Sequence, residues 1–225
     1  YNSINIKVLN NTIRGNSSNI FVINSSNNSL FSNNSVNSSR IIGDGNVIYL
    51  RGSTNDTFIN NTIKSSNNSG IYMSESVNNS FVGTIVKNNG SSVHGIILNT
   101  SSHKNHFLLL NSTALGNSGA AVYIHNSSNN TFVDSINLEG NPSDITYSPN
   151  SHGQNNVFIN CSFSNNNETV DGPKNELVRK WYYQALVKCT TGEAISGANV
   201  SAYNVTNGME FSVLTNASGY TPRMN

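Results

Sequence analysis

The segment that decides the fold is TFINNTI at residues 57–63, because the same pattern returns at regular steps along most of the chain. It recurs as KVLNNTI at 7–13 and as LFSNNSV at 30–36. Looser copies start near Phe81, Phe107, Phe132 and Phe158. The anchor residues lie 23 to 27 positions apart, and a fixed period of this length is typical of a solenoid of stacked repeats.

A second apolar phrase follows each copy of the first, for example GIYM at 70–73 and GIIL at 95–98. Clusters of Asn, Ser and Gly separate these short runs, which is the pattern of strands joined by turns. Helical periodicity is absent up to about residue 170. We therefore expect an all-β fold in which residues 1–170 form a parallel β-helix of roughly seven coils.

Equivalent positions of successive coils stack in columns, so each repeat position predicts one column of side chains. The column expected to fill the core contains Val8, Phe31, Phe58, Phe81, Phe107, Phe132 and Phe158. Asn11, Asn34 and Asn61 follow the first three anchors by three residues. We expect them to adopt left-handed turns and to pair their amides from coil to coil as an Asn ladder. Later repeats carry other residues there, so this ladder is expected in the first three coils alone.

Composition excludes several classes of partner. The chain has 225 residues, among them 44 Asn and 35 Ser, and a formal net charge of +1. This balance supplies no basic field for phosphates or anionic lipids, so we predict no nucleic-acid partner. The longest apolar run, residues 107–110, is far shorter than the roughly 20 residues that span a bilayer. No membrane span is expected, and the start at Tyr1 without a signal sequence predicts a mature or truncated segment.

Strand side chains point alternately into and out of the solenoid, which predicts two outward apolar stripes. The expected stripe residues are Phe21, Ile48, Tyr72, Ile97 and Tyr123 in one, and Ile59, Val82, Leu108, Val133 and Ile159 in the other. Exposed apolar stripes usually mark contact surfaces, so we expect rods that pack side by side or against another part of the protein. The alternatives are a register slip of one residue, or loops that cover the stripes.

The C-terminal fifth differs in composition, because the Asn density falls from Glu176 onward. We expect a linker at 171–179 and a separate β module at 180–225. Cys161 lies in the last coil and Cys189 in the first strand of this module. A disulfide between them would join the two parts, and the alternative is two free thiols.

The NNTI, NNSF and NNTF phrases, with GIYM and GIIL, resemble the repeats of right-handed parallel β-helix proteins of the pectate-lyase type. Within that group they resemble NosD-like surface proteins, which are common in archaea. This resemblance covers about residues 1–168 and implies a right-handed solenoid. GEAISGANV at 192–200 and TNASGYT at 215–221 are similar to phrases of carboxypeptidase-regulatory or Ig-like β-sandwiches, of which 180–225 would be an incomplete part.

Polysaccharide cleavage requires paired carboxylates, or a carboxylate-bound Ca²⁺ beside a basic residue. The acidic residues of the repeats are scattered, and no two stack in one column on adjacent coils. NosD-like proteins are often described as copper-binding, but His103 and His106 would point to opposite faces of a strand. We therefore expect no catalytic residues, no metal site, no cofactor and no enzymatic activity.

The sequence contains 20 N-x-S/T sequons, twice the number that random placement would give. Part of this excess follows from the repeated NNT and NNS phrases, whose structural reason is the turn. Glycans attach at exposed turns of secreted chains. The turn tips expected to carry N-linked glycans are Asn27, Asn67, Asn78, Asn99, Asn126 and Asn129.

These observations predict an extracellular structural protein at the cell surface. We expect a glycosylated subunit of a filament, sheath or S-layer-like assembly, whose partners are copies of itself or other surface proteins. The alternative is a carbohydrate-binding adhesin in which Tyr72 and Tyr123 stack on sugar rings. A polysaccharide lyase or hydrolase is the third reading.

Overall fold

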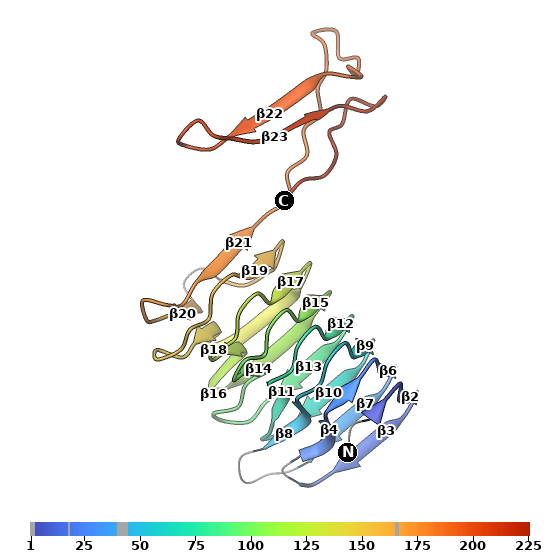
Figure 1. The fold of residues 1–225 in the computed structure, drawn as a ribbon, viewed down its shortest axis with the longest axis vertical. Helices are drawn as coiled ribbons and strands as arrows, with labels where there is room; N and C mark the ends of the chain where they lie inside the picture. The colour runs from blue at the N-terminus through green and yellow to red at the C-terminus, as the bar shows by residue number, and fades with distance from the viewer. Residues whose placement is uncertain (1–2, 18, 40–44, 165–166) are drawn as a thin grey trace. The chain divides into compact units, whose positions relative to one another are not determined.

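The computed structural model describes residues 3–17, 19–39, 45–164 and 167–225. The chain divides into two compact units, Tyr1–Arg179 and Lys180–Asn225. The first unit is a parallel β-solenoid of about seven turns, which confirms the predicted all-β fold (Figure 1). Within the described residues, no helix is long and apolar enough to cross a membrane.

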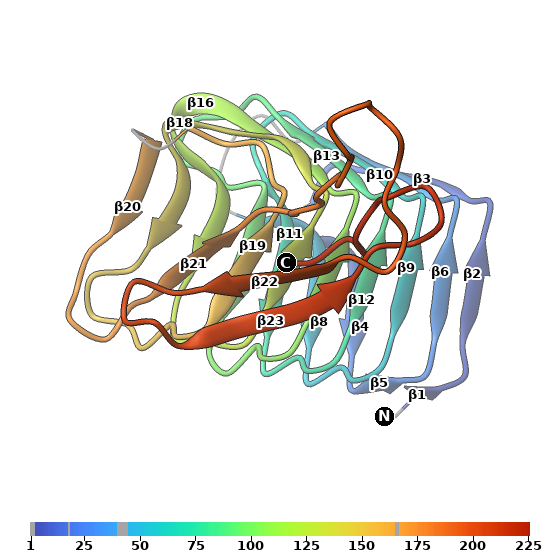
Figure 2. The same cartoon turned by 90° about the horizontal axis from the view of Figure 1, so that it is seen from above.

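One sheet of the solenoid consists of short strands, most of which carry one anchor residue each. The strands in spatial order are β2 (Lys7–Leu9), β6 (Leu30–Ser32), β9 (Thr57–Ile59), β12 (Ser80–Val82), β15 (His106–Leu108), β17 (Thr131–Val133), β19 (Asn156–Ile159) and β21 (Leu177–Lys180). Figure 2 shows β2, β6, β9 and β12 side by side. Anchors pair in register, for example Phe58 with Phe81, so one repeat position makes one continuous column.

The second sheet has eleven strands and covers two faces of the solenoid. One face contains β3 (Thr12–Gly15), β7 (Ser35–Ser38), β10 (Thr62–Ser65) and β13 (Ile85–Asn88), and the other contains β4 (Asn19–Asn24), β8 (Asn46–Arg51), β11 (Ser69–Ser74) and β14 (Ile96–Asn99). The remaining members are β16 (Asn111–Ile124), β18 (Ile136–Tyr147) and β20 (Glu168–Val170). β16 pairs with β13 and with β14, so it joins the two faces into one sheet. A separate small pair is formed by β1 (Ser3–Ile4) and β5 (Ser26–Asn27).

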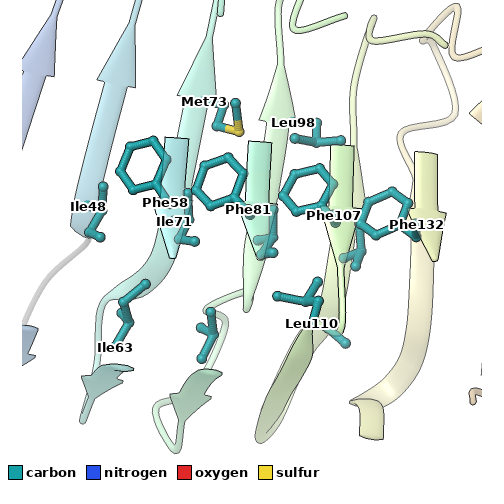
Figure 3. Packing of buried hydrophobic residues seen from close by; sticks show 14 of the residues in the cluster. Ile48, Phe58, Ile63, Ile71, Met73, Phe81, Leu98, Phe107, Leu110 and Phe132 are labelled. Atoms are coloured by element: carbon teal, nitrogen blue, oxygen red, sulfur yellow. The ribbon is translucent and has the colours of Figure 1, made fainter. Parts of the chain in front are cut away.

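The phenylalanine anchors fill the interior as one column of stacked rings, of which Figure 3 shows the middle. From Phe31 to Phe158, successive ring centroids lie 4.4–5.0 Å apart with interplanar angles of 2–13°. All six rings are buried, and Val8 opens the column half-buried. Burying a large apolar side chain contributes about 1.5–3 kcal/mol, so this column is a main source of cohesion between coils.

Asparagine supplies many of the tight turns between strands. The residue two positions after an anchor has a φ of +57° at Asn10, +54° at Asn33 and +51° at Asn60. A second left-handed turn lies three positions before an anchor, with φ of +55° at Asn55 and +60° at Asn78. Apart from glycine, asparagine is the residue that adopts this conformation most readily. The high Asn content is therefore in large part a consequence of turn geometry.

The predicted ladder residues stand next to the first of these turns. Asn34 Oδ1 accepts a hydrogen bond from Asn11 N at 3.0 Å, and Asn61 Oδ1 accepts one from Asn34 N at 2.9 Å. The left-handed φ expected for these residues belongs instead to the residue before each one, because the turn must be completed before the side chain can point inward. At the next rung Thr84 Oγ1 is buried without a hydrogen-bond partner, so the ladder does not extend to that coil.

A second, longer ladder was not predicted. Its rungs lie two residues before the anchors, at Asp56, Asn79, Asn105, Asn130 and Asn156. Asn105 Oδ1 accepts from Asn79 N at 3.0 Å and from Asn79 Nδ2 at 3.1 Å. The same pair of bonds joins Asn130 to Asn105 and Asn156 to Asn130. Every rung is buried, and the bonds between the Asn rungs satisfy polar groups that would otherwise destabilise the interior.

The second unit is a small antiparallel β module. Its strands β22 (Asn199–Tyr203) and β23 (Met209–Leu214) pair in antiparallel fashion. Isolated antiparallel bridges join Tyr183 to Met224 and Leu186 to Tyr220. The linker expected at 171–179 includes the beginning of β21, which continues the first sheet because its backbone pairs there.

Candidate functional site

Side chains six or seven residues after the anchors point outward from the face of β3, β7, β10 and β13. Strand pairing brings them into register. The column, called here the basic column, contains Arg14, Asn37, Lys64, Lys87, Thr113 and Glu139. Adjacent coils are about 4.8 Å apart. Lys64 and Lys87 are exposed and project from paired positions on neighbouring coils, so the face carries two positive charges from adjacent coils.

An open groove of about 600 Å³ follows this column. Lys64, Lys87, Thr113 and Glu139 line it, and the amide side chain of Asn89 stands beside them. Ammonium groups bind anions such as carboxylates, and amides both donate to and accept from hydroxyl groups. The groove therefore offers positive charge and hydrogen bonds in an extended row, with one carboxylate, Glu139, among its lining groups.

The basic column was not predicted, although the repeat carries a signal for it. Arg14, Lys64 and Lys87 all stand six residues after an anchor. Counting charges over the whole chain concealed this alignment, because the net charge is only +1. At Glu139 the spacing becomes seven, because Asn137 adopts a φ of +50° and the pairing with β16 shifts by one residue there.

An aromatic column lies on the other face, over β4, β8, β11, β14, β16, β18 and β20. It contains Val22, Tyr49, Tyr72, Ile97, Tyr123, Thr146 and Thr169, which strand pairing holds in register. The rings of Tyr49 and Tyr72 stack with centroids 5.2 Å apart. Asn99 Nδ2 donates a hydrogen bond to the Tyr72 hydroxyl. A second groove, of about 400 Å³, runs past Tyr72 and Ile97.

His94 lines this second groove and is held in one tautomer. Its Nδ1 accepts a hydrogen bond from Ala120 N at 2.9 Å, so the proton of the neutral ring sits on Nε2. The ring stacks on Tyr123 with centroids 4.6 Å apart. Burial lowers the pKa of His94 to about 4 from an ordinary value of 6.5. His94 is therefore a neutral donor near pH 7, and its accepting nitrogen is already occupied.

Two residues predicted for the first outward stripe point inward instead. Ile48 is 2% exposed, and Phe21 packs edge-on against Phe31 with centroids 5.6 Å apart. Their neighbours Val22 and Tyr49 take the outward positions, because Tyr49 pairs with Tyr72. The prediction was displaced by one residue in these two coils, and such a slip reverses the face of every side chain.

Tyr72, Ile97 and Tyr123 lie in the aromatic column as described above. The other predicted stripe lies on the outer face of the sheet that carries the anchors. Each of its members follows an anchor by one residue. Its members are Ile59, Val82, Leu108, Val133 and Ile159, all half-buried. Leu9 extends the row at 44% exposure, and Ser32 interrupts it.

The six predicted glycosylation residues differ in environment. Asn78 and Asn129 are exposed and adopt φ values of +60° and +59°. Asn27, Asn67, Asn99 and Asn126 are half-buried. The Asn126 amide is engaged, since its Oδ1 accepts from His152 N at 2.9 Å. Backbone conformation is thus sufficient reason for asparagine at Asn78 and Asn129, and glycosylation stays a prediction.

Cys161 and Cys189 are both free. The Cys161 thiol lies 3.4 Å from the carbonyl oxygens of Phe132 and Ile159, and burial raises its pKa to about 11. Cys189 belongs to the second unit. A disulfide between them therefore stays a prediction, and the solenoid cysteine as a free thiol is protonated and unreactive near neutral pH.

Comparison with known proteins gives one family and several similar folds. A family model described as "Right handed beta helix region" matches residues 1–136 and 36–216. No curated protein matches the sequence. Among solved structures, the periplasmic alginate epimerase AlgG is 13% identical with a TM-score of 0.52, over 78% of this chain and 43% of AlgG. The A-module of the Azotobacter vinelandii mannuronan C-5 epimerase AlgE6 is 12% identical with a TM-score of 0.45, over 82% of this chain and 59% of that one.

The expectation that this chain is not an enzyme is corrected by that comparison. We excluded an enzyme because the acidic residues do not stack in one column, yet AlgG, with the same fold, is an epimerase. This fold therefore occurs in an enzyme, and the exclusion of catalysis is withdrawn. At 13% identity the likeness is one of fold, and this chain spans less than half of AlgG, so its chemistry depends on its own side chains.

Proposed function

This chain belongs to the family of right-handed β-helix proteins, and from that premise we propose that its solenoid binds an acidic polysaccharide along the basic column. The observation that carries the proposal is the pair Lys64 and Lys87, which stand on adjacent coils inside a groove. A polymer chain lying parallel to the solenoid axis meets a new coil about every 4.8 Å. Such a chain would bring successive anionic groups past successive basic side chains.

The lining of the groove supports a sugar polymer over other anions. Asn37, Asn89, Asn111 and Asn137 surround the lysines with amide groups, which suit hydroxyl groups that both donate and accept. Arg14, two coils before Lys64, extends the row of positive charge beyond the groove. The single carboxylate of Glu139 would disfavour anionic groups at its own position, so the polymer would be held mainly by the N-terminal and middle coils.

An extracytoplasmic location is part of this proposal, since polysaccharides of this kind are found there and AlgG is described as periplasmic. The predictions of no nucleic-acid partner and no membrane span are kept. A neutral ring of the same polymer could stack near Tyr72 or Tyr123 on the aromatic face, as expected for the adhesin alternative.

The test is titration calorimetry with alginate oligosaccharides, using dextran oligosaccharides of the same length as the neutral control. We expect binding of the acidic polymer alone, weakening as salt is raised, because exposed charge pairs are screened. The double variant Lys64→Glu/Lys87→Glu should bind on the order of 10-fold more weakly. Lys104→Glu, at an exposed turn residue outside the groove, is the matched control and should leave the affinity unchanged.

Equal affinity for charged and neutral polymers, or full binding by the double variant, would show that the basic column is not the site. A single-stranded DNA oligomer serves as a second polyanion and should not compete. Proton NMR of the alginate after incubation with the protein reports whether the bound polymer is also cut or epimerised.

A second candidate function rests on the apolar row of Leu9, Ile59, Val82 and its continuation. Such a row supports lateral association into a surface filament, sheath or S-layer-like assembly. An Ig-like role for the C-terminal module and N-linked glycans at the sequons belong to the same candidate. Electron microscopy and intact-mass measurement test it together. Filaments with masses well above 24.3 kDa per chain would support it, and single unmodified particles would contradict it.

A further inference from the structure

The second ladder contains one carboxylate among its amides. Asn79, Asn105, Asn130 and Asn156 occupy four rungs, and Asp56 occupies the rung before them. Asp56 is 0% exposed. A buried charge without a partner is strongly unfavourable, so a carboxylate at this place needs a physical explanation.

The amide nitrogens of Asn79, Asn105 and Asn130 each lie between two oxygen atoms. Asn79 Nδ2 donates to Ser53 O at 3.0 Å and to Asn105 Oδ1 at 3.1 Å. Asn105 Nδ2 makes the equivalent bonds to Ser76 O at 2.9 Å and to Asn130 Oδ1 at 3.1 Å. The repeat thus places one nitrogen donor between the carbonyl of the preceding coil and the rung of the next coil.

Asp56 has the same orientation in its own coil. Its Oδ1 accepts from Ser29 N at 2.9 Å and from the Ser26 hydroxyl at 3.2 Å, as the Oδ1 of an Asn rung accepts from the preceding coil. Its Oδ2 is buried without a hydrogen-bond partner. By the geometry of the other rungs, Oδ2 takes the place of the amide nitrogen. At the next rung the equivalent nitrogen lies between Ser53 O and Asn105 Oδ1, so the corresponding atoms for Asp56 Oδ2 are Ser26 O and Asn79 Oδ1, both acceptors.

We propose that Asp56 is a proton-binding site in which a protonated Oδ2–H replaces the amide donor and completes the ladder. A proton fits better than a metal ion, because the rungs are joined at hydrogen-bond distances, whereas bound Ca²⁺ needs six to eight oxygens at about 2.3–2.6 Å. The side chains that bond to Asp56 are Ser26 and Asn79, and neither titrates.

The effect on titration agrees with this geometry. Burial raises the pKa of the Asp56 carboxyl above its ordinary value, against the lowering effect of the bonds from Ser29 and Ser26. Within the described residues, no charged side chain contributes to this shift. A carboxyl with a raised folded-state pKa stabilises the fold fully below the unfolded-state pKa, near 3.9, and the stabilisation is lost as the pH rises through the folded-state value.

The consequence is local. Asp56 lies in the segment between β8 and β9 and bonds to Ser26 and Ser29 of the preceding coil. Loss of the proton would weaken the junctions of the Phe58 coil with the coils of Phe31 and Phe81, leaving the Asn rungs after Asn79 intact. The N-terminal end of the solenoid would then loosen as the pH rises, and the rest of the solenoid would not.

The test compares Asp56→Asn with the wild type in the full chain by thermal unfolding between pH 4 and pH 8. Near pH 7.5 we expect the variant to melt about 2–4 °C higher than the wild type, because its amide supplies the missing hydrogen-bond donor at every pH. At pH 4 the difference should vanish. Carbon-13 NMR of the Asp56 carboxyl should show titration above the ordinary range.

The matched control moves the carboxylate to another rung. Asn105→Asp should acquire a new loss of stability with rising pH, and at pH 4 it should melt close to the wild type. A constant difference between Asp56→Asn and the wild type at all pH values would overturn the proposal. So would an Asp56 carboxyl that titrates near pH 3.9, or an Asp56→Asn chain that is less stable throughout.

Discussion

Two columns of the solenoid, one inside and one outside, follow opposite rules. Inside, the anchor position is Phe in six consecutive coils, from Phe31 to Phe158, and the rings stack at nearly constant distance. Outside, six residues later, the basic column changes from arginine through lysine to glutamate. Both columns share the same coil spacing, so the difference comes from their surroundings and not from the backbone.

The difference teaches where this fold tolerates variation. An inner position is in contact with its own copies above and below, so any change of size is felt by two neighbours. An outer position faces solvent on one side, and most substitutions there leave the free energy of unfolding within about 0.5 kcal/mol. The inner columns therefore fix the fold, and the outer columns are free to specify what the solenoid binds.

The largest expected effect comes from breaking the inner column at its centre. Phe81 is fully buried, with ring centroids 4.4 Å from Phe58 and 5.0 Å from Phe107. Phe81→Ala should lower the free energy of unfolding by about 3–5 kcal/mol, measured by chemical denaturation. Val82→Ala, at the adjacent outward position, should lower it by about 1 kcal/mol or less. Comparable losses for the two variants would contradict the distinction between inner and outer columns.

The next largest expected effect on the free energy of unfolding comes from His94, and it depends on pH. Because burial lowers its folded-state pKa to about 4, His94 stabilises the fold above pH 6.5 and this stabilisation is lost as the pH falls towards 4. The whole change is on the order of 3 kcal/mol. His94→Asn keeps an acceptor for Ala120 N but does not titrate, so its unfolding midpoint should vary less over this range.

Asp56 acts in the opposite direction, because its carboxyl stabilises the fold at low pH. The His94→Asn comparison is therefore made in the Asp56→Asn background, where that contribution is absent. An unchanged pH dependence after both substitutions would show that other groups control the acid stability.

Breaking the second Asn ladder is expected to lower the free energy of unfolding somewhat less than Phe81→Ala or protonation of His94. Asn105→Ala removes a side chain that bonds to Asn79, Asn130 and Ser76, leaving buried polar groups unsatisfied. The free energy of unfolding should fall by about 1–3 kcal/mol. Asn78→Gly is the matched control, because glycine keeps the left-handed φ of an exposed turn. A loss as large for Asn78→Gly would mean that turn geometry and not the ladder is the main contribution.

The smallest expected effect is on the outer basic column. Lys64→Gln and Lys87→Gln should each change the free energy of unfolding by less than about 0.5 kcal/mol, by the same denaturation assay. Their effect should be on binding of the acidic polysaccharide alone. A loss of more than about 1 kcal/mol for either one would show that the basic column also supports the fold.

Much of the fold could be predicted because the same residue pattern recurs in each coil. Phe58, Phe81 and Phe107 share one phrase, and a period of 23 to 27 residues has few structural solutions. The stripe prediction failed at Phe21 and Ile48 because a run of consecutive apolar residues does not show which one faces inward. Pairing of Tyr49 with Tyr72 resolves that choice, and it is known only from the sheet register.

The candidate site was harder to predict. Lys64 and Lys87 are 23 residues apart and become neighbours only when their strands pair. The lysines are widely separated along the sequence, and they become neighbours only through pairing between adjacent coils. The same holds for the second ladder, since Asn79 is the middle residue of the sequon at 78–80 and Asn105 stands in a polar segment between strands, and the sequence alone does not show that both side chains point inside.

The sequence by itself determined the strand class, the repeat length and the identity of the stacked core, because these depend on local patterns that recur in every coil. The tertiary structure decided which residues face each other across coils. Side-chain contacts in a solenoid run perpendicular to the chain, at a register fixed by backbone pairing and by single extra residues such as Asn137. That register places the Asp56 carboxylate in the buried ladder and sets Lys64 beside Lys87 on the outer face.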